Sequence, residues 1–364
     1  MSSLSHAQAG WISGIFFAGY TAVVPFLVSL TDRVDPRRVY LASTAITVVS
    51  TLAFALIADG FWTALVCRAL GGVGLAGTYM PGLKALTDRA ADDQRARISG
   101  IYTATYSAAA SVSFVFIGVF DDLFGWRWAF VIMGTGFLIM GLLLWKRMEK
   151  ARRLVPKAVD PVAGNLPFHQ KVGDVLRQAR ARVVLGTVLL EGASAFGVVA
   201  MGVTHLHEHQ GVSLSLAGLA ISMFGLGCLC YAAAARHFIL RLGEAGMIHV
   251  GTLMFGLPFL WIAWVPEWHS AMLASFISGF GFFMFHNTLQ ALATQMHPPQ
   301  RATCMTLFAG TLFSGQSLGV WIAAQLVDRW GTAWVIAMGA VMVMLMGQYI
   351  PALLKRTTPR MTAP

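Results

Sequence analysis

Three ionisable residues lie deep inside long apolar stretches of the sequence: Arg68, Glu191 and His286. Placing such a group in hydrocarbon costs roughly 2.5–3.5 kcal/mol even on the lenient insertion scale, so these residues mark functional positions by default. Glu191 is the only acid at this depth. Burial favours its protonated form and a nearby cation such as Arg68 favours the carboxylate, so Glu191 could load and release a proton. A protonated Glu191 bonded to a neighbouring helix is the structural alternative.

Arg68 and His286 each allow a functional and a structural interpretation. Arg68 stays charged and could anchor an anion or tune a nearby carboxylate, or it could be a structural counter-charge that extends toward the outer interface. His286 and Gln290 are four residues apart and share a helix face with Asn287 close by. They could bind a ligand by hydrogen bonds or form a satisfied interhelical cluster. Weaker candidates for the same cavity are Tyr79, Tyr102, Tyr106 and Gln316.

Other patterns in the chain do not support a metal centre or an enzyme. His205, His207 and His209 alternate with other residues, a spacing that can bind a transition metal, but we favour a solvated outer loop. No Gly-rich loop precedes a Lys followed by Ser or Thr, so ATP hydrolysis is unsupported. No apolar stretch pairs a nucleophile with a base at helical spacing. We therefore expect no metal, no cofactor and no enzymatic activity.

The composition indicates an all-α membrane protein. Of the 364 residues, 57% are apolar and 12% are charged, about half the charged fraction of soluble domains. The apolar residues form blocks of about 20, long enough to cross ~30 Å of hydrocarbon as a helix, and only helices or closed barrels satisfy the backbone there. The eleven expected spans are 7–30, 39–58, 62–83, 98–120, 128–145, 183–203, 214–235, 247–265, 270–293, 304–326 and 333–353.

The basic residues predict an orientation for these spans. If the segment after the first span is cytoplasmic, nearly all Lys and Arg residues fall on the cytoplasmic side, whereas Arg127 and Arg329 alone fall outside and Arg68 lies within a span. This asymmetry is the positive-inside pattern, so the net charge of +10 indicates a membrane surface rather than nucleic acid. We expect the N-terminus outside, the C-terminus in the cytoplasm, and no secretory signal peptide, because residues 1–31 contain no Lys or Arg.

The chain divides into two related halves. A charged, proline-containing segment at 146–182 separates a five-helix bundle at 1–145 from a six-helix bundle at 183–354, and 355–364 form a cytoplasmic tail. Residues recur 206 positions later, and duplicated halves predict a transporter with its site between them. The recurring residues are Leu83, Ala85, Leu86, Gln94, Arg95, Ala96, Asp122, Gly125 and Trp128, matched by Leu289, Ala291, Leu292, Gln300, Arg301, Ala302, Asp328, Gly331 and Trp334.

Three motifs resemble those of the major facilitator superfamily (MFS). They are the loop at 32–38, with Asp32, Arg33, Arg37 and Arg38, the Arg68 helix with its run of small residues, and the Gly-Trp-Arg-Trp turn at 125–128. The resemblance implies that Arg68, Glu191 and His286 lie on cavity-lining helices. It also implies that the 32–38 loop is a cytoplasmic gating latch, although Arg37 and Arg38 serve topology in any case.

The chain also departs from the family pattern. The loop at 32–38 follows the first span here, whereas in the family it follows the second helix. We therefore expect that the first family helix is missing, through a misassigned start or a fragment; a genuine eleven-helix protein is the alternative. The stretch Tyr106 to Ser111 stands where drug–proton antiporters carry a Gly-Pro motif.

Together these features predict a secondary transporter that is most like the MFS. We expect it to move a small organic solute, coupled to protons, by alternating access in the cell membrane, and the resemblance alone implies export. The expected partners are the solute, protons and the lipid bilayer, with no nucleic acid, and the protein is expected to be a monomer. The alternatives are uptake of an organic anion and a membrane sensor or scaffold that transports nothing.

Overall fold

The computed structural model describes residues 5–30, 34–87, 90, 92–152, 168–265 and 267–357. Every regular element within these ranges is a helix, which confirms the all-α prediction. The elements are α1 (His6–Leu30), α2 (Pro36–Ile57), α3 (Phe61–Thr87), α4 (Asp92–Phe124), α5 (Trp126–Arg152), α6 (Phe168–Arg177), α7 (Ala179–Gln210), α8 (Leu214–Trp264), α9 (Trp268–Thr294), a 3-10 turn η1 (Pro298–Gln300) and α10 (Arg301–Thr357).

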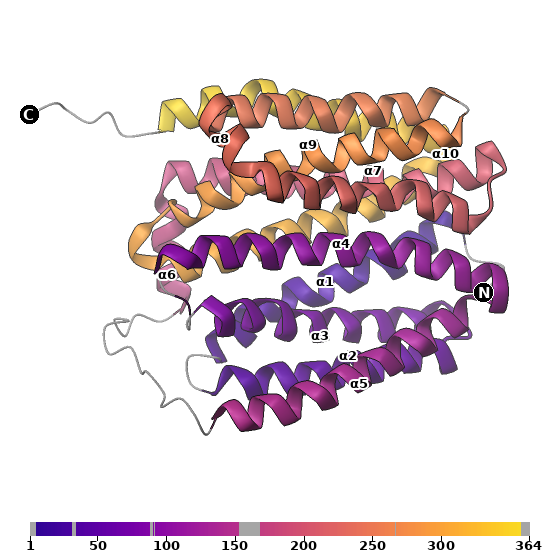
Figure 1. The fold of residues 1–364 in the computed structure, drawn as a ribbon, viewed down its shortest axis with the longest axis horizontal. Coiled ribbons are helices and arrows are strands. Elements are labelled where there is room, and N and C mark those ends of the chain that lie inside the picture. The colour runs from indigo at the N-terminus through magenta and orange to yellow at the C-terminus, as the bar shows by residue number, and fades with distance from the viewer. Residues whose placement is uncertain are drawn as a thin grey trace, which may run out of the picture.

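Nine helices in the described ranges are long and apolar enough to cross a membrane. Two of these, α8 with 51 residues and α10 with 57, exceed the ~20 residues that one crossing requires. Each is interrupted by one glycine with non-helical angles, Gly243 (φ 62°) in α8 and Gly331 (φ 77°) in α10. Figure 1 shows α8 turning back on itself at its break. The count of eleven membrane crossings stays a prediction.

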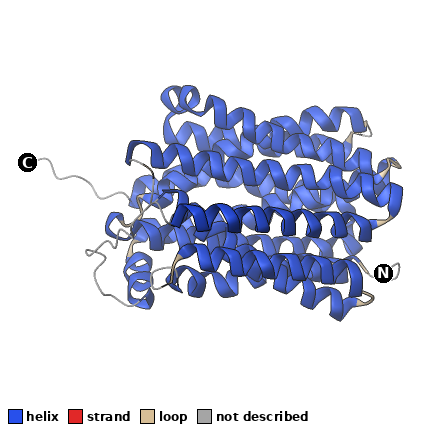
Figure 2. Ribbon diagram, turned by 60° about the horizontal axis from the view of Figure 1, so that its bottom comes forward, coloured by secondary structure: helices blue, strands red, loops and turns tan. Residues whose placement is uncertain are grey.

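The helices form one elongated bundle in two parts. Figure 1 places α1 to α5 below and α7 to α10 above, and Figure 2 shows the same helices running side by side from another direction. The two parts meet where α4 packs on α8 and α1 packs on α10. The N-terminal end of α1 and the C-terminal end of α10 lie at opposite ends of the bundle (Figure 1).

The two parts are packed differently. In the C-terminal part, α7 lies along α10, and a Cβ at Gly192 would collide with the carbonyl oxygen of Leu312. In the apolar segment of α7, 56% of the residues are buried, compared with 12% in α4 and 11% in α5. The described helices of the N-terminal part therefore leave much of α4 and α5 uncovered.

Two expected loops contain helical structure. The segment with His205, His207 and His209 is not a loop, because α7 continues to Gln210 and ends at Gly211, whose φ of 63° is the left-handed conformation of a helix C-cap. His205 is buried, and its Nδ1 lies 2.7 Å from Oγ1 of Thr332. The expected linker at 146–182 begins as the end of α5 and includes α6, and its middle, 153–167, lies outside the described residues.

Candidate functional site

Glu191 and His286, predicted separately from the sequence, form a buried pair. Nδ1 of His286 on α9 lies 3.0 Å from Oε1 of Glu191 on α7, and the two residues are 4% and 0% exposed. Oε2 of Glu191 has no hydrogen-bond partner among the described residues. Either the imidazole N–H donates to the carboxylate or the protonated carboxyl donates to the ring nitrogen. The two groups can therefore hold one proton between them.

Aromatic rings surround this pair and connect it to the other half. The ring of Phe282 stacks on His286 with centroids 5.4 Å apart, and Phe196 lies 6.1 Å from Phe282. Phe196 in turn contacts Phe17 of α1 at 6.4 Å, and Phe17 contacts Phe313 of α10 at 5.8 Å. A continuous line of rings thus runs from α9 through α7 to α1.

Gln290 joins the two halves directly. Its Nε2 donates a hydrogen bond of 3.3 Å to Oγ1 of Thr103 on α4, and both residues are buried. Gln290 lies one helical turn beyond His286 on α9, so a movement of α4 relative to α9 would break this bond next to the buried pair. Asn287 is half-buried on the same helix.

The tyrosines predicted for the cavity cluster in the N-terminal half. Tyr79 lies 5.5 Å from Tyr102 and 5.1 Å from Tyr106, measured between ring centroids. They line a pocket of about 400 Å³ between α2, α3 and α4. This cluster reaches the C-terminal half through Phe313, whose ring lies 6.1 Å from that of Tyr79.

Two further buried polar groups lie on α10 and α1. Gln316 on α10 is 1% exposed, and neither amide atom has a hydrogen-bond partner among the described residues. The hydroxyl of Tyr20 on α1 is also without a partner there, and its ring stacks on Phe313 at 3.9 Å. Unsatisfied buried polar groups are rare in folded proteins and need an explanation.

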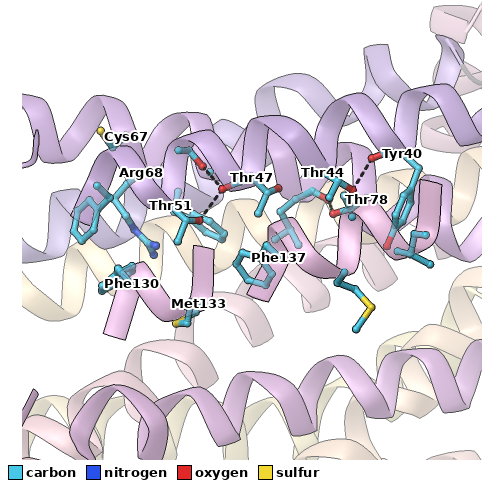
Figure 3. A pocket seen from close by; sticks show the side chains of 18 residues that line it. Tyr40, Thr44, Thr47, Thr51, Cys67, Arg68, Thr78, Phe130, Met133 and Phe137 are labelled. Carbon is cyan, nitrogen blue, oxygen red and sulfur yellow. Dashed lines mark hydrogen bonds between the residues drawn. The ribbon is translucent and has the colours of Figure 1, made fainter. Parts of the chain in front are cut away.

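Arg68 lies apart from the buried pair. Its guanidinium points into a groove lined by α2, α3 and α5 with Phe16 of α1 (Figure 3), and its carbon Cζ lies 4.5 Å from the centroid of the Phe16 ring. The structure therefore brings Glu191 and His286 together and places Arg68 in the N-terminal half alone.

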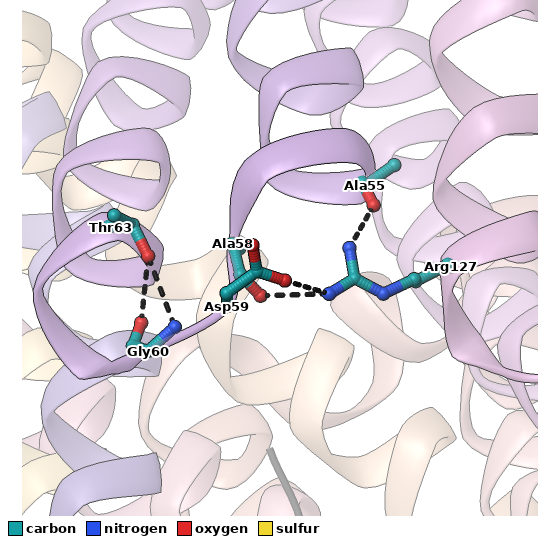
Figure 4. Close-up of polar contacts among 6 residues, drawn as sticks. All are labelled: Ala55, Ala58, Asp59, Gly60, Thr63 and Arg127. Atoms are coloured by element: carbon teal, nitrogen blue, oxygen red, sulfur yellow. Dashed lines mark hydrogen bonds and ion pairs between the residues drawn. The ribbon is translucent and has the colours of Figure 1, made fainter.

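Arg127, which the sequence places on the outer side, joins two helix ends. Its guanidinium donates to the carbonyl oxygens of Ala55 and Ala58, the second at 3.2 Å, and to Oδ1 of Asp59 at 2.7 Å (Figure 4). Carbonyl groups at a helix C-terminus lack partners within the helix. Arg127 thus caps α2 from the first turn of α5.

The predicted gating latch is described only in part. Asp32 and Arg33 lie outside the described residues. Arg37 and Arg38 are in the first turn of α2, where the side chain of Asp35 accepts a hydrogen bond of 3.0 Å from the backbone N–H of Arg37. Asp35 is therefore the N-cap of α2, and the latch itself stays a prediction.

Sequence reasoning missed most of the site's aromatic residues. Phenylalanines are frequent throughout the spans, so no pattern separates those at the junction from those facing lipid. Thr103 was also missed, because single hydroxyl residues are common in the spans. The residues that reasoning from the sequence did not identify are Phe17, Tyr20, Thr103, Phe196, Phe282, Phe308 and Phe313.

Comparison with known proteins gives one consistent family. The family model described as Major Facilitator Superfamily matches residues 2–320 and 184–364. The "Uncharacterized transporter YgaY" of Escherichia coli O157:H7 is 24% identical over 365 residues, covering 94% of this chain and 86% of that protein. The "Inner membrane transport protein YnfM" of Escherichia coli K12 is 26% identical over 160 residues, which cover 44% of this chain and 36% of that protein.

A further relative and a solved structure are also transporters. The "Probable sphingolipid transporter spinster homolog 2" of Arabidopsis thaliana is 25% identical over 145 residues, 39% of this chain and 30% of that protein. The crystal structure of the nucleoside transporter NupG superposes with a TM-score of 0.71 at 14% identity, covering 97% of this chain and 91% of that one. At that identity the likeness concerns the fold alone.

Proposed function

From the premise that this chain belongs to the major facilitator superfamily of transporters, we propose that it is a proton-coupled secondary transporter that exports a small organic solute. The observation that carries this proposal is the buried pair of Glu191 and His286, 3.0 Å apart. Two titratable groups sharing a hydrogen bond at membrane depth are unusual unless they serve a proton or ligand path.

The pair has the properties that coupling requires. A carboxyl with one oxygen bonded to an imidazole and the other oxygen without a partner can gain or lose a proton with little movement of the protein. Its position on α7, beside the helices that meet α1 and α4, links its charge to the contact between the halves. Protonation would then favour one arrangement of the halves over the other, which is how a ligand shifts an equilibrium.

The direction of transport is proposed from the motifs, and the substrate class from the charges at the junction of the two halves. Export follows the resemblance of the motifs alone. A cationic or neutral organic solute fits the junction better than an anion, because Glu191 is the acid there and Arg68 lies in a separate groove. The uptake of an anion held by Arg68 is therefore the less favoured of the two transport modes.

Transport and its coupling can be tested in sealed vesicles. A thermal-shift screen of organic cations and neutral aromatic compounds on the purified protein supplies ligands. The protein is then reconstituted into vesicles that contain a pH-sensitive dye, and a pH gradient is imposed. We expect a ligand that binds to discharge the gradient, and Glu191→Gln to abolish the discharge while the ligand still binds.

A matched acid outside the pair serves as the control. Glu267 precedes α9 at the end of the bundle, and its side chain does not cap the helix, so Glu267→Gln should discharge the gradient as the unmodified protein does. Ligand binding without flux in every variant would support the sensor alternative. Proton-driven flux that persists in Glu191→Gln would remove the coupling role of the pair.

A further inference from the structure

A stripe of buried residues on α10 faces the N-terminal half. Successive members are four, three and four residues apart, which places them on one side of the helix. They are Ala309, Phe313, Gln316 and Val320, and all four are buried. Ala309 and Phe313 pack in one apolar cluster with Tyr20 of α1. Gln316 therefore lies on the side of α10 that meets the other half.

Gln316 is the polar member of this stripe, and its amide is unsatisfied. Neither the carbonyl oxygen nor the amino group of the side chain has a hydrogen-bond partner among the described residues. The backbone of α7 is close by, since a Cβ at Gly192 would lie 3.1 Å from the backbone nitrogen of Gln316. The stripe thus holds a buried amide whose donor and acceptor are both available to a ligand.

A pair of stacked rings beside Gln316 joins the two halves. The ring of Tyr20 on α1 lies on that of Phe313, with centroids 3.9 Å apart and 30° between the ring planes. The hydroxyl of Tyr20 is buried and, like the amide of Gln316, has no partner in the described part of the chain. Because the two rings belong to different halves, a separation of the halves parts them and exposes two flat apolar faces.

Further aromatic rings border this stack. Phe17 of α1 lies 5.8 Å from Phe313, and Tyr79 and Tyr106 approach Phe313 edge-on at 6.1 and 6.3 Å, measured between ring centroids. Aromatic side chains prefer offset-stacked and edge-to-face partners. The surroundings of the stack therefore favour a flat aromatic ligand.

We propose that the transported solute is a neutral, planar ring system that carries a hydrogen-bond donor and an acceptor side by side, such as the N–H and C=O of a lactam. The ring lies between Tyr20 and Phe313 when the halves part, and its polar edge forms two hydrogen bonds with the amide of Gln316. Amide side chains bind the donor and acceptor of a nucleic-acid base in the same bidentate way. The proposal rests on the transport function proposed above and names its substrate class.

Two paired hydrogen bonds should make the site selective. A solute that lacks the donor leaves the buried carbonyl oxygen of Gln316 unpaired, and sites built to hydrogen-bond a substrate reject such an analogue strongly. Water molecules would also satisfy the amide, but they give no preference between two solutes of the same shape. The preference therefore separates a ligand site from a hydrated amide.

The preference is measured by isothermal titration calorimetry on the purified, unmodified protein in detergent. The probes are 2-quinolone and N-methyl-2-quinolone, which share the planar ring and the carbonyl group, whereas only the first has the N–H. We expect 2-quinolone to bind at least about tenfold more tightly. Equal affinities, or no binding of either compound, would overturn the proposal.

A variant of Gln316 shows whether its amide makes the contact. Gln316→Leu should remove the preference for 2-quinolone, whereas Gln348→Leu, the same change at an exposed position of α10, should retain it. Thermal unfolding checks that Gln316→Leu is folded, and replacing an unsatisfied amide by an apolar side chain should not lower its melting temperature. If the folded Gln316→Leu protein keeps the preference, the amide does not contact the ligand and the proposal is wrong.

The same compounds separate the ligand class from the transport function. Calorimetry measures binding at equilibrium and requires neither flux nor a proton gradient. Preferential binding of 2-quinolone without any discharge of the gradient in vesicles would remove the transport function and leave the binding site. Discharge by another ligand, combined with equal affinities for the two quinolones, would remove the ligand class alone.

Discussion

At the residue scale, the chemistry of the site depends on Glu191 and His286 acting as one unit. Oε1 of Glu191 is bonded and Oε2 is not, and no part of the residue is exposed. A buried carboxylate that loses its remaining partner is more destabilising than a site from which both polar groups have been removed. The two residues should therefore show strong energetic coupling.

We expect His286→Phe to lower the free energy of unfolding by about 1–3 kcal/mol, the cost of a buried polar group left without a partner. The double variant Glu191→Leu with His286→Phe should be more stable than His286→Phe alone, because no polar group then remains unsatisfied. The coupling is measured by a double-mutant cycle: thermal unfolding of the unmodified protein, the two single variants and the double variant in the same detergent. If the effects of the two single substitutions simply add, the two residues do not interact.

Glu191, His286 and Arg68 show which properties of single residues can be predicted from the sequence and which cannot. Glu191 and His286 could be selected because an ionisable type inside an apolar block is rare, and the selection does not depend on knowing the fold. Arg68 was selected on the same ground, but its direction could not be predicted. The helix that carries it is apolar around most of its circumference, so no polar stripe indicates which face points to the other half.

At the scale of elements, one glycine in each of α8 and α10 interrupts the helical backbone. Gly331 has φ 77° and ψ 165°, and Gly243 has φ 62° and ψ 177°. This region is essentially restricted to glycine, and another residue there is strained by about 1–3 kcal/mol. Both glycines have open space at the position of a Cβ, so any effect of substitution comes from the backbone conformation.

We expect Gly331→Ala to lower the melting temperature through a loss of about 1–3 kcal/mol of stability. Gly136 in α5 is the matched control, since it is also free of contacts at the Cβ position but has ordinary helical angles. Gly136→Ala should be neutral or stabilising by up to ~1 kcal/mol. Thermal unfolding of both variants provides the comparison, and equal melting temperatures would show that the break at Gly331 is not strained.

A second prediction at this scale concerns the Arg127 cap. The ion pair with Asp59 is largely in solvent, with side-chain exposures of 40% and 83%, so Asp59→Asn should change stability by less than about 1 kcal/mol. Arg127→Gln removes the donors to Ala55 and Ala58 at the end of α2 as well. We expect Arg127→Gln to lower the free energy of unfolding by about 1–3 kcal/mol, more than Asp59→Asn does. Chemical unfolding of both variants shows which substitution costs more stability, and a larger effect at Asp59 would contradict the capping role of Arg127.

The helices themselves were largely predictable, because a long apolar stretch of sequence is enough to indicate a membrane-spanning helix. Each expected span lies within one described helix, apart from 39–58 and 247–265, which each extend one residue beyond the end of the helix, at Ile57 of α2 and Trp264 of α8. The His205 segment was misread because alternating histidines near a Gly look like a polar loop. Burial of His205 against Thr332, a contact between residues far apart in sequence, lets the helix continue to Gln210.

At the scale of the whole molecule, the two halves are held together at the end of the bundle where α1 begins. Ser317 of α10 donates a 2.8 Å hydrogen bond to the carbonyl oxygen of Gly14 on α1, and a Cβ at Gly218 of α8 would lie 2.6 Å from the carbonyl oxygen of Phe114 on α4. At both points the helices of the two halves approach closely enough to be in direct contact. Alternating access requires these contacts to separate in another state.

One charged contact at this end can be removed without disturbing the packing. Oδ2 of Asp122, at the end of α4, accepts a 3.2 Å hydrogen bond from the backbone N–H of Ser215 in the first turn of α8. A carboxylate at a helix N-terminus contributes typically 0.3–1 kcal/mol when it is exposed, as Asp122 is. Because α4 and α8 belong to different halves, this energy stabilises the closed arrangement specifically.

We therefore expect Asp122→Ala to raise the population of the state that is open at this end about two- to fivefold, the ratio that 0.3–1 kcal/mol represents. Spin labels are attached at Trp62→Cys and Trp330→Cys, two exposed positions on different halves near this end. The distance between the two labels is measured by pulsed electron paramagnetic resonance. The native cysteines are first replaced. Asp121→Ala is the control, because the side chain of Asp121 makes no hydrogen bond to α8 within the described residues. If both substitutions shift the distance distribution equally, the effect comes from charge in general and the bond to Ser215 does not hold the halves closed.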